Sequence, residues 1–139
     1  MLIHPALVHF PIALCFAALA LEILGQALGR KEWVSAGLPL IAMTALGALA
    51  AVASGLLTPQ EHKDVAPIAL ETHELAAFSG TGLILLTTVL RVVFRNDYTG
   101  RRPGVVLMTL ALSALCFSGA GFMGGQLVFD YGAGVKMPR

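Results

Sequence analysis

Four long apolar runs alternate with three short polar links along the chain. The runs cover residues 6–28, 33–57, 68–94 and 105–127, and each is long enough to cross a bilayer core, which takes about 20 residues of helix. Because the links are short, consecutive helices are expected to run antiparallel. The pattern predicts an all-α, transmembrane up-down-up-down four-helix bundle that forms a single domain over residues 1–139.

The composition favours lipid over water around this bundle. The chain is 57% hydrophobic and only 12% charged, whereas each helix of a soluble bundle needs a polar face. The charged residues are too few to supply such faces. The net charge of +1 gives no reason to expect nucleic acid as a partner, and the lipid bilayer is the expected one.

The basic residues predict which way the bundle is oriented. They gather on the side that holds the first and third links, at Arg30, Lys31, Arg91, Arg95, Arg101 and Arg102. Loops rich in Lys and Arg stay in the cytoplasm. Both termini and the second link are therefore expected on the periplasmic or exterior side. The first apolar run lacks a basic n-region and is too long for the core of a cleavable signal peptide.

All four histidines fall at the predicted exterior end. His4 precedes Pro5, which is favoured at the first helical position, so His4 can be explained as the residue that caps the start of the helix. His62 lies in a polar link and is explained as a solvated residue. His9 and His73 lie about one turn inside two different helices, where ionisable groups usually face the bundle interior or a water-filled cavity. These two are the stronger candidates for a ligand site, although interior hydrogen bonding remains the alternative.

Small residues accompany the two candidate histidines. The stripes include Ala13 after His9, Ala77 and Gly80 after His73, and Gly121 and Gly125 on the fourth helix. Such stripes let transmembrane helices pack closely, and they would also leave room for a flat macrocycle. Because haem iron accepts histidine ligands, the first hypothesis is a small b-type cytochrome or cytochrome subunit. It would hold haem b between His9 and His73 and exchange electrons with a quinone or a periplasmic redox protein.

Two further hypotheses compete with haem. The first is a zinc or copper site built from His4, His9, His62 and His73, which requires three or four imidazoles to converge. The second is a cofactor-free accessory subunit of a larger membrane complex, a homo- or hetero-oligomer packed through the small stripes. No nucleophile–base arrangement, phosphate loop or clear internal repeat is evident. An electron carrier or subunit is therefore favoured over a stand-alone enzyme.

One pair of charged residues is expected inside the bilayer. Glu22 lies toward the cytoplasmic half of the first helix, and Arg91 lies at comparable depth on the third. An isolated carboxylate there would be desolvated and costly. We expect the two side chains to pair as a structural staple rather than as a proton relay.

Several motifs along the chain resemble those of a widespread bacterial membrane family, domain of unknown function 2231. The resemblance rests on the opening 4–11 (HPALVHFP), on 54–57 (SGLL), on His73, and on the closing segments 124–128 (GGQLV) and 132–135 (GAGV). It covers essentially the whole chain. It implies a four-helix, multi-pass protein of the bacterial inner membrane. Some relatives carry fused or neighbouring redox domains, which would suit haem-based electron transfer.

Overall fold

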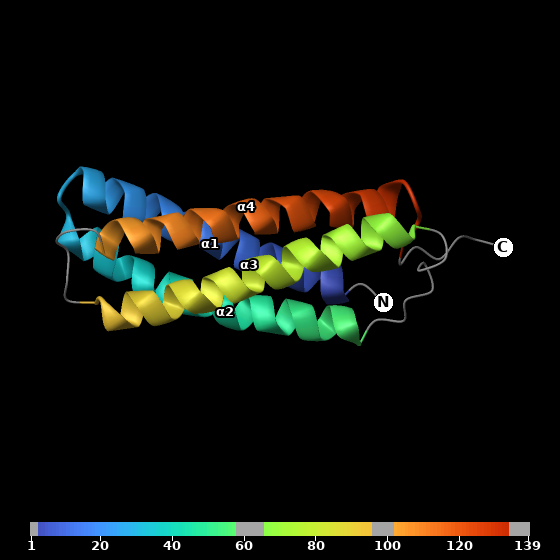
Figure 1. Ribbon diagram of the computed structural model, residues 1–139, viewed down its shortest axis with the longest axis horizontal. Helices are drawn as coiled ribbons and strands as arrows, with labels where there is room; N and C mark the ends of the chain where they lie inside the picture. The colour runs from blue at the N-terminus through green and yellow to red at the C-terminus, as the bar shows by residue number, and fades with distance from the viewer. Residues whose placement is uncertain (1–2, 58–65, 96–101, 134–139) are drawn as a thin grey trace.

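The computed structural model describes residues 3–57, 66–95 and 102–133, and this part of the chain forms four helices. They are α1 (Ile3–Ala27), α2 (Lys31–Leu56), α3 (Pro67–Val93) and α4 (Arg102–Phe129). All four run along the long axis, and the start of α1 lies at the same end as the end of α4 (Figure 1). This confirms the all-α four-helix bundle.

Each helix is long and apolar enough to span a membrane. The helices contain 25 to 28 residues, which gives lengths of roughly 37–42 Å, more than the roughly 30 Å of a bilayer's hydrocarbon core. Large apolar side chains such as Leu46, Leu115 and Phe122 are exposed on the outside of the bundle. This surface suits lipid tails, and the chain is a membrane protein with four candidate spans.

The helix ends differ from the sequence prediction by a few residues. Helix α1 begins at Ile3, so Pro5 lies within its first turn. Backbone N–H groups in the first turn have no acceptor within the helix, so a proline there removes no hydrogen bond. Helix α4 runs through Gly124 and Gly125 to Phe129, because glycine weakens a helix without breaking it. The stop after α1 lies at Gly29, whose φ is 64°, as the sequence predicts.

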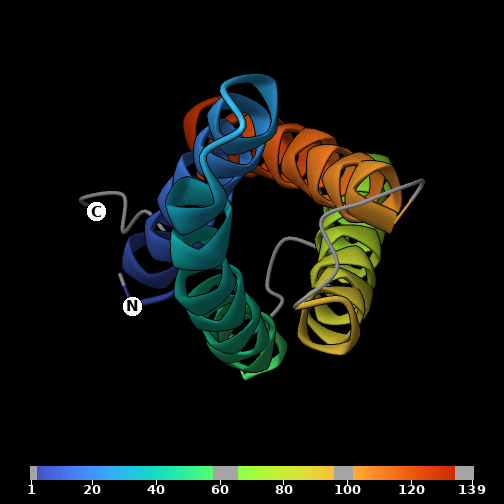
Figure 2. The same ribbon diagram turned by 90° about the vertical axis from the view of Figure 1, so that its left-hand side faces the viewer.

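The bundle is made of two helical hairpins. Helix α1 packs mainly on α2 and α3 mainly on α4, while the contacts of α2 with α3 and of α1 with α4 are less extensive. Figure 2 shows the two pairs from one end. The core between them contains the fully buried side chains of Cys15, Ile41, Ile84 and Leu110.

Positions in the two hairpins correspond at an offset of 69 residues along the sequence, which is the separation of Glu22 and Arg91. Buried side chains recur at this spacing, in the pairs Cys15 and Ile84, Ala18 and Thr87, Ile41 and Leu110, Thr44 and Ser113, Ala48 and Phe117. The hydroxyls of Thr44 and Ser113 each donate to the carbonyl four residues earlier. Glu22 and Arg91, which correspond at this offset, are in contact, as is typical of positions related by two-fold symmetry. Since α1 and α3 run in the same direction, the approximate axis lies along the helices.

The correspondence between the hairpins is not evident from the residue types, in which no clear internal repeat was found. Residue types mostly differ between the halves: Cys15 corresponds to Ile84, and Glu22 to Arg91. What repeats is the burial of each position and its place in the packing. A comparison of residue types alone therefore misses this correspondence.

Candidate functional site

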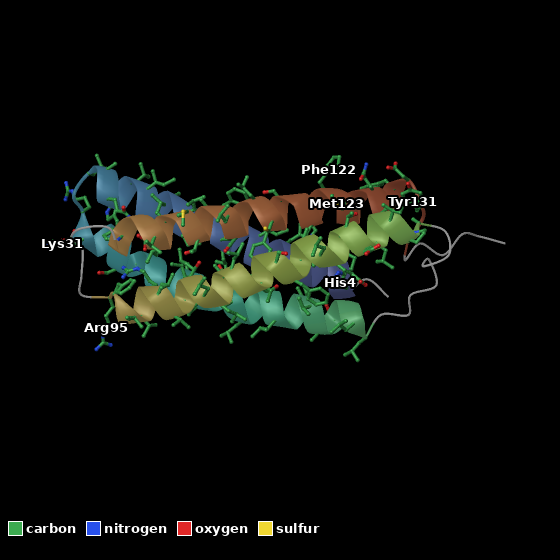
Figure 3. All side chains as sticks on the ribbon, viewed as in Figure 1. His4, Lys31, Arg95, Phe122, Met123 and Tyr131 are labelled. Atoms are coloured by element: carbon green, nitrogen blue, oxygen red, sulfur yellow. The ribbon has the colours of Figure 1, made fainter. Side chains whose placement is uncertain are left out.

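The imidazoles of His4 and His73 lie next to each other between the two hairpins in an edge-on arrangement. His4 is in the first turn of α1, and His73 is in the second turn of α3. Their ring centroids are 6.4 Å apart and their planes are nearly perpendicular, at 84°. Figure 3 places His4 at the end of the bundle that also holds Met123 and Tyr131. Because the two histidines are 69 residues apart, this pair lies on the approximate two-fold axis.

Each ring is anchored through its Nδ1 atom to the partner helix of its own hairpin. His4 Nδ1 lies 3.1 Å from the carbonyl oxygen of Ala51 and 2.8 Å from Ser54 Oγ. His73 Nδ1 lies 2.9 Å from the carbonyl oxygen of Ala120. Both carbonyl bonds span 47 residues, so the two anchors are equivalent under the symmetry.

These bonds decide which nitrogen of each neutral ring carries the proton. A carbonyl oxygen only accepts hydrogen bonds, so Nδ1 of both His4 and His73 must be the donor. The lone pair of each neutral imidazole is then on Nε2. Neither Nε2 atom forms a hydrogen bond with any residue that the structure describes. The arrangement therefore presents two ring nitrogens that are able to accept a proton or to bind a metal ion.

A cavity of about 510 Å³ surrounds the two rings. All four helices contribute to its wall, which is mainly apolar and includes Ala48, Ala77, Phe117, Ala120, Gly121 and Gly125. A volume of roughly 300–1,000 Å³ with a few placed polar groups is typical of small-molecule and cofactor sites. The polar lining of this cavity consists of the imidazoles of His4 and His73 together with His9, Glu74 and Thr81.

A second cavity lies at the opposite end of the bundle, beside a buried ion pair. Its volume is about 450 Å³, and it is lined by Glu22, Gln26, Lys31, Val34 and Arg91 among others. Arg91 Nε donates to Glu22 Oε1 at 2.8 Å, and the two side chains are only 4% and 1% exposed. The expected Glu22–Arg91 pair is therefore confirmed.

The comparison with protein families covers nearly the whole chain. Residues 2–137 match the family model described as a predicted membrane protein, DUF2231. The chain belongs to the DUF2231 family. The resemblance seen in the sequence motifs is thus confirmed, as is the membrane character of the protein. The curated proteins and the solved structures contain no match.

His9 takes a different position in this DUF2231 protein from the one expected. It is exposed at the edge of the cavity, and its Nδ1 donates to the carbonyl oxygen of Pro5 in its own helix at 2.6 Å. The ring that meets His73 is that of His4. His4 was predicted only as a metal ligand or a helix end, and not as the haem partner of His73, because the start of α1 was placed after this residue.

The other expected site residues divide into two groups. Ala77, Gly121 and Gly125 line the cavity, as the haem hypothesis requires. Ala13 is exposed and is not part of the cavity wall. Gly80 is buried in the contact between α3 and α4, where a Cβ atom would come within 2.8 Å of the Phe117 ring. Its small size serves helix packing.

The four-histidine metal cluster does not form among the described residues of the DUF2231 chain. Within residues 3–57, 66–95 and 102–133, no three or more His, Cys, Asp or Glu side chains are grouped so that they could hold a metal ion. His4 and His73 come together without His9, and His62 lies outside the described residues.

Proposed function

We propose that this DUF2231 protein is a small membrane b-type cytochrome in which His4 and His73 hold one haem iron from opposite sides. The observation that carries the proposal is the pair of facing imidazoles, each bound through Nδ1 to a backbone carbonyl of the neighbouring helix. The haem hypothesis of the sequence analysis is kept, with His4 in place of His9.

The spacing of the rings supports two axial ligands. A metal ion bonded to two opposite imidazoles at about 2 Å from each nitrogen holds the ring centres roughly 6 Å apart. The centroids of His4 and His73 are 6.4 Å apart. The separation of the two rings is therefore close to the one that a shared iron requires.

The hydrogen bonds support ligation by Nε2. Histidine ligands of metals usually donate the other ring N–H to a carbonyl or a carboxylate, which fixes the tautomer and raises the basicity of the ligand. Ala51 and Ala120 supply such carbonyls to His4 and His73. Ser54 adds a second contact to the His4 ring.

The cavity wall supports a flat, largely apolar ligand. The two hairpins contribute small residues to it, among them Ala48, Ala77 and Gly121. Haem held by His4 and His73 would lie between the hairpins, where helix contacts are less extensive. When bound, haem supplies one-electron transfer at the iron, while the apolar wall excludes water from it.

A metal site and a cofactor-free subunit explain these observations less well. Zinc takes four ligands in structural sites and three protein ligands in catalytic sites, whereas two facing imidazoles are the ligand set typical of low-spin haem. A purely structural role would account for the two Nδ1 bonds. It would not account for the apolar cavity that surrounds the two Nε2 lone pairs.

The charge distribution supports a site near the outer face of a bacterial inner membrane. Lys31 and Arg95 lie at the end opposite His4 (Figure 3), and loops with basic residues stay in the cytoplasm. The termini and the haem would then be on the periplasmic side. A quinone in the membrane or a periplasmic redox protein would be within reach as the electron partner.

The visible spectrum of the purified full-length chain tests the proposal. The chain would be expressed in a haem-supplemented bacterium, purified in detergent and measured as the reduced-minus-oxidised difference. We expect a Soret band with the α and β bands of six-coordinate, low-spin haem b, and one haem for each chain. A colourless protein with no Soret band would contradict the function, and metal analysis of the same sample would identify bound zinc or copper.

A further inference from the structure

The buried ion pair at the cytoplasmic end links three helices. Arg91 of α3 donates to Glu22 of α1 at 2.8 Å and to the carbonyl oxygen of Val34 in α2 at 2.6 Å. Gln26 donates to the other carboxylate oxygen of Glu22 at 3.2 Å. Through Arg91, the second hairpin is thus bound to both helices of the first hairpin. The proposed cytochrome function does not itself require this pair.

The ion pair and the imidazole pair lie on the same faces of their helices. His4 and Glu22 are about five complete helical turns apart on α1, and His73 and Arg91 are the same distance apart on α3. Both pairs also join residues related by the 69-residue repeat. Each pair therefore lies close to the approximate two-fold axis, one near each end of the bundle.

We propose that Glu22 and Arg91 are positioning residues for the imidazole pair, an inference that rests on the proposed function for its haem-binding consequence. The pair sets the rotation of the α1–α2 hairpin against the α3–α4 hairpin, so that His4 meets His73 at the other end. A turn of α3 by one residue rotates Arg91 away from Glu22 by about 100°. Since an unpaired charge inside a membrane is costly, the ion pair selects a single register.

Cross-linking at the histidine end measures this register without haem. In a Cys15→Ala/Cys116→Ala background, His4→Cys and His73→Cys would be joined within one chain by a short bifunctional methanethiosulfonate and detected by mass spectrometry. We expect efficient cross-linking when Glu22 and Arg91 are intact. Arg91→Gln or Glu22→Gln is expected to reduce the cross-linking rate at least fivefold, because the hairpins lose their fixed rotation.

Three further variants separate positioning from simple loss of fold. Arg91→Lys keeps the charge and should restore most of the cross-linking. The exchange Glu22→Arg/Arg91→Glu should also restore it, because the two positions are equivalent. Gln26→Leu, which removes a bond to Glu22 from within α1, should leave the rate unchanged. Each variant would first be shown to be monodisperse in detergent.

The haem-binding chain provides a second measurement. With both histidines present, Arg91→Gln should convert part of the haem from low spin to high spin, and Arg91→Lys should reverse the change. Monodisperse Gln variants with the parental cross-linking rate and spin state would overturn the positioning role. Because the cross-linking chain lacks both histidines, a colourless wild type would contradict only the cytochrome function.

Discussion

At the scale of single residues, each facing imidazole lies against a glycine of the neighbouring helix. A Cβ atom at Gly55 would be 3.1 Å from Cε1 of His4, and one at Gly124 would be 3.2 Å from Cε1 of His73. These distances are too short for a relaxed contact. Because Gly55 and Gly124 have no side chain, the His4 ring can lie against α2 and the His73 ring against α4.

Alanine substitutions at these glycines test how tightly the rings are held. We expect Gly55→Ala and Gly124→Ala each to tilt the adjacent ring and to lower haem retention on purification several-fold. Gly119→Ala is the matched control, since a Cβ atom there meets nothing within 4 Å, and it should retain haem like the wild type. Equal haem retention in all three variants would show that the glycines do not shape the site.

The inward position of His4 could have been predicted from the sequence, by comparing the angular positions of residues around α1. Glu22 is an acidic residue in an apolar helix and so marks the inward face. His4 lies about five whole turns from Glu22, whereas His9 lies about three and a half turns away and so points to the opposite side. Depth along the helix, the criterion used to choose among the histidines, does not distinguish these two sides. His73 satisfied the depth criterion, and it also shares the face of Arg91, which lies about five whole turns away.

At the scale of helices, the close approach of α3 and α4 depends on Gly80. A Cβ atom there would come within 2.8 Å of the Phe117 ring and 3.2 Å of Cys116 Cβ. Phe117 is itself 6% exposed and belongs to the core. The ring therefore cannot move away without opening the contact between the two helices.

Gly80→Ala is accordingly expected to destabilise the bundle. Overpacking of a core contact of this kind destabilises by about 1–3 kcal/mol, which would lower the thermal midpoint measured in detergent by several degrees. Gly82→Ala on the same helix has open space around it and gains helix propensity, so its midpoint should stay the same or rise slightly. A Gly80→Ala midpoint equal to that of the control would contradict the packing role.

The four helices could be predicted well from the sequence, but the correspondence between the two hairpins could not. Apolar length and short links are enough to define four antiparallel spans. The correspondence at 69 residues was hidden because lipid-facing and buried positions tolerate many apolar residue types. Its clearest sign is the equal spacing of His4 from Glu22 and of His73 from Arg91, but their opposite charges disguise the equivalence.

At the scale of the whole molecule, the two ends of the bundle differ in chemistry. One end holds the imidazoles and the larger apolar cavity, and the other holds the ion pair and basic side chains such as Lys31 and Arg95. The approximate two-fold axis runs from one to the other. The molecule is therefore expected to take one orientation across the membrane. The proposed exchange of electrons at the outer face requires such a fixed orientation.

Reporter fusions test that direction. Alkaline phosphatase fused after the last residue should be active in a bacterial host, because it folds only in the periplasm, and a green fluorescent protein at the same place should be dark. The same reporters placed in the link between α3 and α4 should behave in the opposite way. The reverse pattern would put the histidine end in the cytoplasm and contradict the proposed orientation.

The most direct test of the account is the haem content and spin state of three single histidine variants in the full-length chain. His4→Ala and His73→Ala should each lose haem or retain it only in a high-spin form, and added imidazole should restore the low-spin spectrum. His9→Ala, changed at an exposed position on the same helix as His4, should keep the wild-type spectrum and one haem per chain. If His4→Ala keeps a low-spin haem while His9→Ala loses it, the pairing of His4 with His73 as ligands is wrong.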